Sequence, residues 1–165
     1  MQTNSRLQEI VYGALLTAIA ILIPVAFGGY LRIYIPPFSA TLASHLPVFI
    51  SMLISPFAAV FVGFGSALGF FLIMGPVIGA RAAVHILVGG TGAYLIKKGF
   101  GFGWALVAVA PIHALGEALI VVPFGFSFYE AGVLVGIGTL LHHMMDGFLA
   151  YVVVRSLQKT SSVLS

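Results

Sequence analysis

FAAVFVGFGSALGFFLIM, residues 57–74, is a stretch of sequence without a single charged side chain. A membrane-spanning helix needs about 20 mostly apolar residues, because each residue adds about 1.5 Å of helix length and the hydrocarbon layer is about 30 Å thick. This stretch has that composition and nearly that length. We therefore expect it to cross a membrane as one helix.

The composition of the whole chain indicates the same class of protein. Hydrophobic residues make up 61% of the chain, charged residues 7%, and the mean hydropathy is +1.16, whereas soluble domains average about 45–50% apolar residues. The absence of cysteine excludes disulfides and thiolate chemistry. The net charge of +3 lies mostly near the chain ends and in one short loop, which indicates membrane orientation and not nucleic-acid binding. We expect a multi-pass protein of the cell membrane.

Proline, glycine and charged residues divide the chain into six helical segments within a single domain, residues 1–165. The segments cover about 9–27, 42–55, 57–74, 78–96, 104–126 and 132–154. The second is short and contains Pro47, and the fifth contains Pro111 and Pro123, where we expect kinks. The sequence thus predicts an all-α integral membrane protein with six transmembrane helices.

Basic residues outside these segments predict the orientation of the chain. Five of these six residues fall on one side of a six-helix arrangement: Arg6, Lys97, Lys98, Arg155 and Lys159. Cytoplasmic loops are enriched in lysine and arginine, so we expect both termini to be cytoplasmic. Arg32 lies in an outer connection, residues 29–41, that is rich in tyrosine and proline. This connection could be a lid over a pocket or an interfacial aromatic belt.

Three pairs of ionisable residues, each four positions apart, lie inside the apolar segments. The pairs are Arg81 and His85, His113 and Glu117, and His142 and Asp146. A charged side chain near the bilayer centre costs roughly 2.5–3.5 kcal/mol on the insertion scale, so such residues usually face a cavity and carry function. Given six helices, most of these side chains fall at a similar depth in the outer half. The sequence therefore predicts one polar pocket that opens outward.

Each pair also has a purely structural interpretation. Residues four apart on a helix face each other, so a pair can be a hydrogen bond that serves helix packing. Asp146 lies deepest, and it could hold His142 or His143 in one tautomer or contact another subunit. Adjacent histidines point about 100° apart, so at most one of the two should line the same wall as Asp146. His45 could join the pocket or cap a helix end at the interface.

The side chains also predict the kind of ligand. Arg81 offers a planar fork suited to a carboxylate, and the histidines offer donors or acceptors for a ring nitrogen, hydroxyl or amide. Tyr34, Phe70 and Phe71 could provide apolar faces for a small heterocycle. A small organic anion suits this set better than a cation, because each membrane acid has a nearby histidine to neutralise it.

Other classes of function fit the residues less well. The histidines and acids could ligate a transition metal, but no helix carries His-x-x-x-His. A proton relay through four of these side chains would make the chain a stand-alone ion-coupled transporter or channel, but only Asp146 tends toward the inner surface. A helix-packing subunit without a ligand is a further alternative. Motifs for hydrolases and for a phosphate loop are absent, so we expect neither an enzyme nor a cofactor.

Together these features resemble the substrate-binding subunit, the S component, of an energy-coupling factor (ECF) vitamin transporter. The resemblance covers essentially the whole chain. It is carried by the motif ALLTA (residues 14–18), by the connection over the site, and by the segments TLASHLP (41–47), ISP (54–56) and GSALGFF (65–71). The later segments are similar to members associated with niacin or pantothenate uptake.

The resemblance implies a mechanism and partners. Ala14 and Ala18 would contact a transmembrane coupling subunit, and substrate would bind between the outer halves of helices four to six under the connection after helix one. The S component would topple in the membrane, together with the coupling subunit and two ATPase subunits, to release the vitamin inside. Cobalt and nickel members carry histidine after the first Met, where this chain has Gln2. Niacin is the first substrate expected and pantothenate the second.

Overall fold

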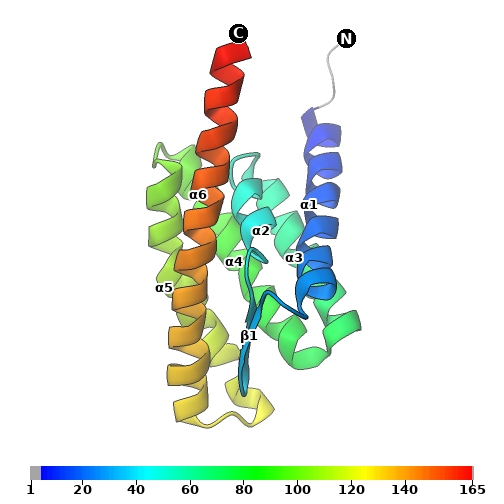
Figure 1. The fold of residues 1–165 in the computed structure, drawn as a ribbon, viewed down its shortest axis with the longest axis vertical. Helices are drawn as coiled ribbons and strands as arrows, with labels where there is room; N and C mark the ends of the chain where they lie inside the picture. Colours follow the sequence, from blue (N-terminus) through cyan, green and yellow to red (C-terminus); the bar gives the residue numbers. More distant parts are fainter. Residues whose placement is uncertain (1–4, 165) are drawn as a thin grey trace.

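The computed structural model describes residues 5–164, which form a bundle of helices with one small hairpin. Figure 1 shows the long helices side by side, with both ends of the chain at the same end of the bundle. The elements in chain order are α1 (Ser5–Phe27), β1 (Arg32–Ile35), β2 (Phe38–Thr41), α2 (Leu46–Ser51), α3 (Pro56–Met74), α4 (Pro76–Lys97), α5 (Phe102–Ile120), the 3-10 turn η1 (Val122–Phe124), the π-helix η2 (Glu130–Ile137) and α6 (Gly138–Leu164).

Four helical stretches within residues 5–164 are long and apolar enough to cross a membrane. They are Arg6–Phe27, Pro56–Met74, Phe102–Phe124 and Glu130–Thr160. The helix α4 is also long, at 22 residues, although Arg81 and Lys97 lower its hydropathy. The protein is therefore an all-α, multi-pass membrane protein apart from its hairpin, and the predicted six crossings stay a prediction.

The second predicted segment, residues 42–55 with a break at Pro47, does not form a membrane-spanning helix. The α-helix α2 covers only Leu46–Ser51, which is far too short to span a bilayer. Pro47 is tolerated in its first turn, where the missing N–H would have no helical partner. Ser55 then starts α3, because its side chain accepts a hydrogen bond from the backbone N–H of Ala58 at 3.0 Å. The mostly apolar composition of this region did not reveal that two separate helices begin in it, one at Leu46 and one at Pro56.

The connection predicted as a loop, residues 29–41, contains an antiparallel hairpin. Strand β1 pairs with β2 so that Tyr34 lies opposite Ser39. The residues of β1 are exposed, whereas β2 is almost entirely buried against the helices. Phe38 and Ala40 supply the buried apolar side chains of β2. The hairpin is thus held to the bundle by its second strand.

The last two long helices differ from the predicted bounds. The helix α5 ends at Ile120, and Pro123 lies in the 3-10 turn that follows. The final helical stretch begins where the Oγ of Ser127 and the carboxylate of Glu130 accept hydrogen bonds from each other's backbone N–H, which is a capping box. This stretch continues past residue 154 to Leu164 because its polar last turns can be solvated outside the hydrocarbon layer.

Close helix contacts and apolar clusters position the polar residues. A Cβ on Gly63 would lie 2.7 Å from the backbone nitrogen of Ile86, so glycine lets α3 approach α4. Along α5, His113 and Glu117 lie between two apolar clusters, one containing Val109 and the other containing Val121. The polar side chains are therefore enclosed by packed apolar layers on both sides.

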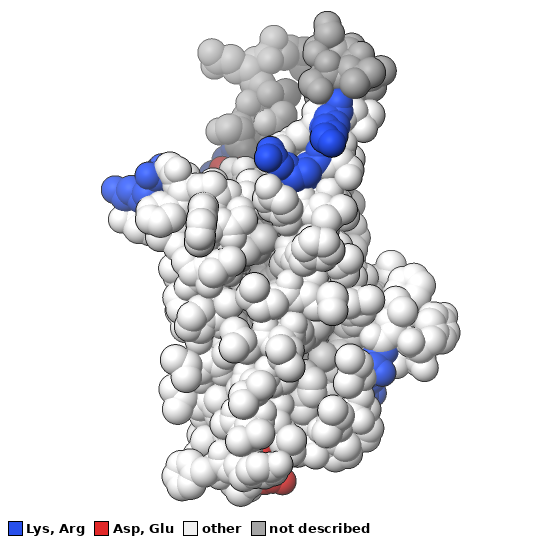
Figure 2. Space-filling view, turned by 60° about the vertical axis from the view of Figure 1, so that its left-hand side comes forward, with Lys and Arg blue, Asp and Glu red and all other residues white. Residues whose placement is uncertain are grey.

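The charged side chains are unevenly distributed over the surface. Figure 2 shows lysine and arginine gathered near the end of the molecule that carries both termini. Arg6 lies at the start of α1, Lys97 at the end of α4, and Arg155 in the last part of α6. Apart from one basic side chain low on the right-hand side, the surface between the two ends shows no lysine, arginine, aspartate or glutamate in this view, as expected for a surface that faces lipid.

Candidate binding site

A cavity of about 70 Å³ lies between the hairpin and the helices α3 to α6. Five of the seven side chains predicted to contact substrate line this cavity: His45, Arg81, His85, Glu117 and His142. Phe70 forms part of its apolar wall, whereas the neighbouring Phe71 is 53% exposed and points elsewhere. Adjacent helical residues point about 100° apart, so only one of two consecutive phenylalanines can face a given cavity.

The structure places the other two predicted residues outside the cavity wall. His113 is fully buried behind it, with its ring centroid 5.0 Å from that of His85. Tyr34 is 61% exposed on β1, so the structure does not bring it to the cavity. Its ring instead lies 4.8 Å from the guanidinium carbon of Arg32, which does line the cavity.

Arg81 and Glu117 form a buried ion pair between α4 and α5. The Nη2 and Nε atoms of Arg81 lie 2.7 Å and 2.8 Å from the Oε2 of Glu117. The hydroxyl of Thr139 on α6 also donates a hydrogen bond to this oxygen, at 2.6 Å. The partner of Arg81 is therefore on another helix and is not His85, with which it was paired in the sequence. The ion pair neutralises a charge that we expected to be free.

The guanidinium of Arg81 also meets the hairpin. Its Nη1 and Nη2 each donate to the carbonyl of Ser39 at 3.4 Å, the long limit of a hydrogen bond. Its carbon lies 5.4 Å from the centre of the Phe38 ring. Among the described residues, the contact with Ser39 is the one hydrogen bond that Nη1 makes. This atom therefore keeps donor capacity for a ligand in the cavity.

Asp146 fastens the segment before α2 to α6. Its carboxylate is fully buried and accepts the backbone N–H groups of Ala43 and His45, at 2.7 Å and 3.0 Å. Ala43 has φ of +69°, a left-handed conformation that costs a non-glycine residue roughly 1–2 kcal/mol. Hydrogen bonds to a charged acceptor are among the stronger ones, so the Asp146 carboxylate stabilises this strained turn.

Asp146 also orients the histidines of the cavity, as one of its predicted roles required. The Nε2 of His142 lies 3.1 Å from Oδ2 of Asp146 and 3.0 Å from the carbonyl of Thr41. Both neighbours are acceptors, so Nε2 carries a proton that points toward them. The Nδ1 of His45 lies 3.0 Å from the same carboxylate oxygen. His45 stands at the N-cap position of α2, but its side chain makes no capping hydrogen bond and lines the cavity instead.

Of the two adjacent histidines, only His142 lines the cavity, which confirms the expectation that they would diverge. His143 is buried and points toward α5, where its Nε2 lies 3.0 Å from the carbonyl of Leu106. Its Nδ1 lies 2.9 Å from the Nδ1 of His113. His143 therefore connects α6 to the back of the site.

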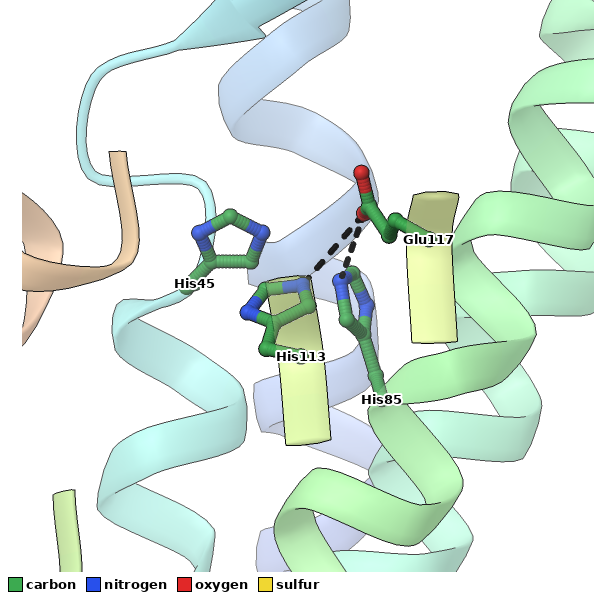
Figure 3. Close-up of side chains that lie close together, drawn as sticks. All are labelled: His45, His85, His113 and Glu117. Carbon is green, nitrogen blue, oxygen red and sulfur yellow. Dashed lines mark ion pairs between the residues drawn. The ribbon is translucent and has the colours of Figure 1, made fainter. Parts of the chain in front are cut away.

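Four donor side chains converge from three elements in Figure 3: His45, His85, His113 and Glu117. One nitrogen or oxygen atom from each lies within 4.8 Å of the others, so this set could hold a metal ion. Sequence spacing predicted only the pair His113 and Glu117, whose Nε2 and Oε1 are 3.3 Å apart. We call these four side chains the histidine cluster.

Sequence reasoning missed several cavity residues on and beside the hairpin. Arg32, Ser39, Thr41 and Ser44 line the cavity, but they were treated as parts of a loop or of a helix start. Arg32 carried a signal that could have identified it, because it is the one basic residue in an outer connection. The others are small polar residues that no spacing rule distinguishes.

Comparison with known proteins gives one curated relative. No family model and no solved structure match the chain. The niacin transporter NiaX of Lactococcus lactis subsp. cremoris (strain MG1363) is 35% identical over 164 residues, which cover 89% of this chain and 73% of the relative. Identity at this level over most of both chains confirms the resemblance carried by the sequence motifs. The chain belongs to the niacin-type S components of energy-coupling factor transporters.

Proposed function

We propose that this chain captures niacin from outside the cell and passes it inward as the substrate-binding subunit of an ECF transporter. Its partners would be a transmembrane coupling subunit and two ATPase subunits. The observation that carries the choice of substrate is the 35% identity to a niacin transporter. Pantothenate is the second candidate, because it also offers a carboxylate.

The ligand carboxylate would bind at Arg81. Glu117 holds Nε and one side of the guanidinium, so that Nη1 and the remaining hydrogen of Nη2 stay directed at the cavity and the hairpin. Charge-assisted hydrogen bonds from arginine to a carboxylate are strong and have a defined geometry. Arg32 on β1 adds a second positive charge to the cavity wall. Two cations thus face one ion-paired acid, which supports binding of an anion.

The ring of the ligand would lie against the apolar wall. Phe70, Ile78 and Ala82 form this wall, and the hydroxyl of Ser44 and the ring of His142 provide polar groups beside it. The cavity of about 70 Å³ is small compared with sites for drug-sized ligands, which are about 300–1,000 Å³. A compact aromatic ring suits it better than the extended chain of pantothenate. The size of the cavity therefore favours niacin.

We assign both termini to the cytoplasm and count six crossings, with residues 42–55, which contain α2, as the second. The basic residues near the end that carries the termini support this orientation. Ala14 and Ala18 are exposed on α1, while Gly13 and Ala20 on the same helix are buried. We assign the exposed pair to contact with the coupling subunit, since small side chains let another helix approach closely.

A stand-alone proton pathway is less well supported. A path of polar contacts runs from Glu117 through His113 and His143, but it ends at the carbonyl of Leu106, which can only accept. Within the described part of the chain, this path does not continue from Leu106 to the end that carries the termini. The geometry therefore favours binding of a ligand over conduction of protons.

The test of the proposed function is calorimetric titration of the purified, ligand-stripped protein in detergent. Nicotinic acid should bind with one site per chain, while nicotinamide, which lacks the carboxylate, should bind at least about 10-fold more weakly. Binding of pantothenate alone would keep the mechanism and change the substrate. If none of the three ligands binds, the assignment of this cavity to a carboxylate vitamin is wrong.

A further inference from the structure

The histidine cluster contains ring nitrogens that the polar network does not satisfy. The Nδ1 of His45, both nitrogens of His85 and the Nε2 of His113 are buried and have no hydrogen-bond partner within residues 5–164. Buried polar atoms are nearly always paired, and each exception calls for an explanation such as a bound ion. Here four of them occur on three neighbouring rings. The lack of hydrogen-bond partners is therefore a property of the whole site and not of one side chain.

The tautomers of the cluster can be deduced from the hydrogen bonds behind it. The carbonyl of Leu106 only accepts, so the Nε2 of His143 carries a proton and its Nδ1 has the lone pair. His113 must then donate from its own Nδ1, 2.9 Å away. A neutral His113 consequently presents the lone pair of Nε2 to the Oε1 of Glu117 at 3.3 Å. Two lone pairs face each other unless a positive charge lies between them.

Glu117 is oriented in a similar way. Its Oε2 accepts hydrogen bonds from the Nε of Arg81 and the hydroxyl of Thr139 and also lies 2.7 Å from the Nη2 of Arg81, so this oxygen is surrounded by donors. Its Oε1 points into the histidine cluster and lies 4.0 Å from the Nε2 of His85. Because these donors hold Oε2 in place, Oε1 is directed at the imidazole rings of His85 and His113. This arrangement is typical of a carboxylate ligand held by outer hydrogen bonds.

We propose that His45, His85, His113 and Glu117 bind one divalent transition-metal ion, with Zn²⁺ as the best match. Three imidazole nitrogens and one carboxylate oxygen are a common tetrahedral donor set for Zn²⁺. Bonds of about 2.0–2.1 Å put tetrahedral ligand atoms roughly 3.4 Å apart. The four donor atoms here lie within 4.8 Å of one another, so small side-chain movements would close the site. The Nδ1 of His45 faces Asp146, so we assign its Nε2 to the ion.

A second donor set next to the cluster is a poorer candidate. His45, His142 and Asp146 also converge. The Asp146 carboxylate already accepts two backbone N–H groups, and the Nε2 of His142 already faces the carbonyl of Thr41. An ion at this second set would have to displace those contacts. At the histidine cluster it would instead satisfy atoms that have no partner among the described residues.

This inference goes beyond the proposed function, because an ion held by buried side chains is a resident part of the protein and not its cargo. Glu117, His45 and His85 also line the cavity. The ion would therefore add positive charge to the inner wall that an anionic ligand meets. Ion binding can be measured without any vitamin, so failure of one proposal is distinguishable from failure of the other.

The test uses the full chain, treated with a chelator, dialysed and titrated with Zn²⁺ in the absence of vitamin. We expect one ion per chain by elemental analysis. We also expect the thermal midpoint to rise by about 5–10 °C at roughly 100-fold the dissociation constant. His85→Leu should abolish both effects while folding normally, because His85 makes no hydrogen bond within the described chain. His142→Leu, a matched histidine from the cavity wall, should keep them.

Three results would overturn the proposal. One is the absence of stoichiometric Zn²⁺ binding, which would leave a protonated His113 as the explanation of its contact with Glu117. Another is binding that survives His85→Leu but is lost in His142→Leu, which would assign the ion to the second set. X-ray absorption at the zinc edge of the wild-type protein needs no variant. It should report three nitrogens and one oxygen, and a water-dominated shell would contradict the site.

Discussion

The Nη2 of Arg81 lies 2.7 Å from the Oε2 of Glu117, and both side chains are buried. Each residue lies on a different helix, and Thr139 of a third helix donates to the same oxygen. The ion pair therefore serves two purposes at once, since it joins α4 to α5 and keeps the guanidinium in one orientation. Its removal should affect both stability and ligand binding.

Arg81→Gln should destabilise the protein by about 3–5 kcal/mol, because it leaves the Glu117 carboxylate buried without its cation. The double variant Arg81→Gln/Glu117→Gln removes both charges and should recover most of that loss. Thermal unfolding in detergent, with midpoints compared among the wild-type, single and double variants, measures the difference. Equal midpoints for the single and double variants would show that the pair is not energetically coupled.

Arg81→Lys should weaken nicotinic acid binding by about 10- to 100-fold while keeping the charge. Lysine offers a single ammonium, which cannot hold Glu117 and a ligand carboxylate in the fixed geometry of a guanidinium. Calorimetry measures the affinity. Lys98→Arg is the control, because Lys98 lies at the other end of α4, and its affinity should match that of the wild type. Unchanged affinity in Arg81→Lys would mean that the carboxylate binds elsewhere.

Asp146→Ala should loosen the turn that precedes α2. The backbone N–H groups of Ala43 and His45 lose their acceptor, and the left-handed conformation of Ala43 loses its support. Hydrogen exchange at these two amides should therefore accelerate by at least about 10-fold, which corresponds to roughly 1.4 kcal/mol of local stability. Glu130→Gln, far from this turn in the structure, should leave both rates unchanged. Protection that persists in Asp146→Ala would rule out this anchoring role.

Gly63→Leu should destabilise the protein by about 1–3 kcal/mol, because even a Cβ there would lie 2.7 Å from the backbone of Ile86. The matched control is Gly132→Ala, where a Cβ would meet no described atom within 4 Å. Thermal unfolding should show a lower midpoint only for the Gly63 variant. A normal midpoint for Gly63→Leu would mean that α3 and α4 can separate at little cost.

Ala14→Leu combined with Ala18→Leu should leave nicotinic acid binding by the isolated chain unchanged, since both side chains are exposed and neither lines the cavity. Uptake of labelled niacin by cells that carry the complete transporter should fall to background, because leucine prevents close approach of a coupling helix. Normal uptake would contradict the assignment of this face of α1. Loss of binding by the isolated chain would indicate a folding defect instead.

The parts of the site that the sequence predicted are those fixed within one helix. Spacing of four residues brought His113 to Glu117 and His142 to Asp146, at 3.3 Å and 3.1 Å, because a helix imposes that geometry wherever it lies. The partner of Arg81 could not be predicted, since it depends on how α4 and α5 are arranged. Tyr34 was misplaced for a similar reason, because the aromatic composition of a segment does not reveal which strand of a hairpin is buried.

The fold was predictable where hydropathy alone determines it. The segments 57–74 and 78–96 agree with α3 and α4 to within a few residues. The structure of residues 42–55 was not predictable from hydropathy, because a short helix between turns has the same apolar composition as a longer helix. The turn before this short helix is held by the carboxylate of Asp146, which lies about 100 residues later in the sequence. A contact between residues so far apart in the sequence produces no local sequence pattern from which it could be predicted.

The hairpin also limits where lipid can reach. Within residues 5–164, β1 pairs only with β2, so its outward edge has backbone N–H and C=O groups without a strand beside them. Hydrocarbon cannot solvate such groups, and non-helical backbone at membrane depth is tolerated only where protein or water surrounds it. Water or protein must therefore surround β1 wherever it lies at membrane depth. In aqueous surroundings, a small dissolved molecule could reach Arg32, which lines the cavity, without crossing lipid.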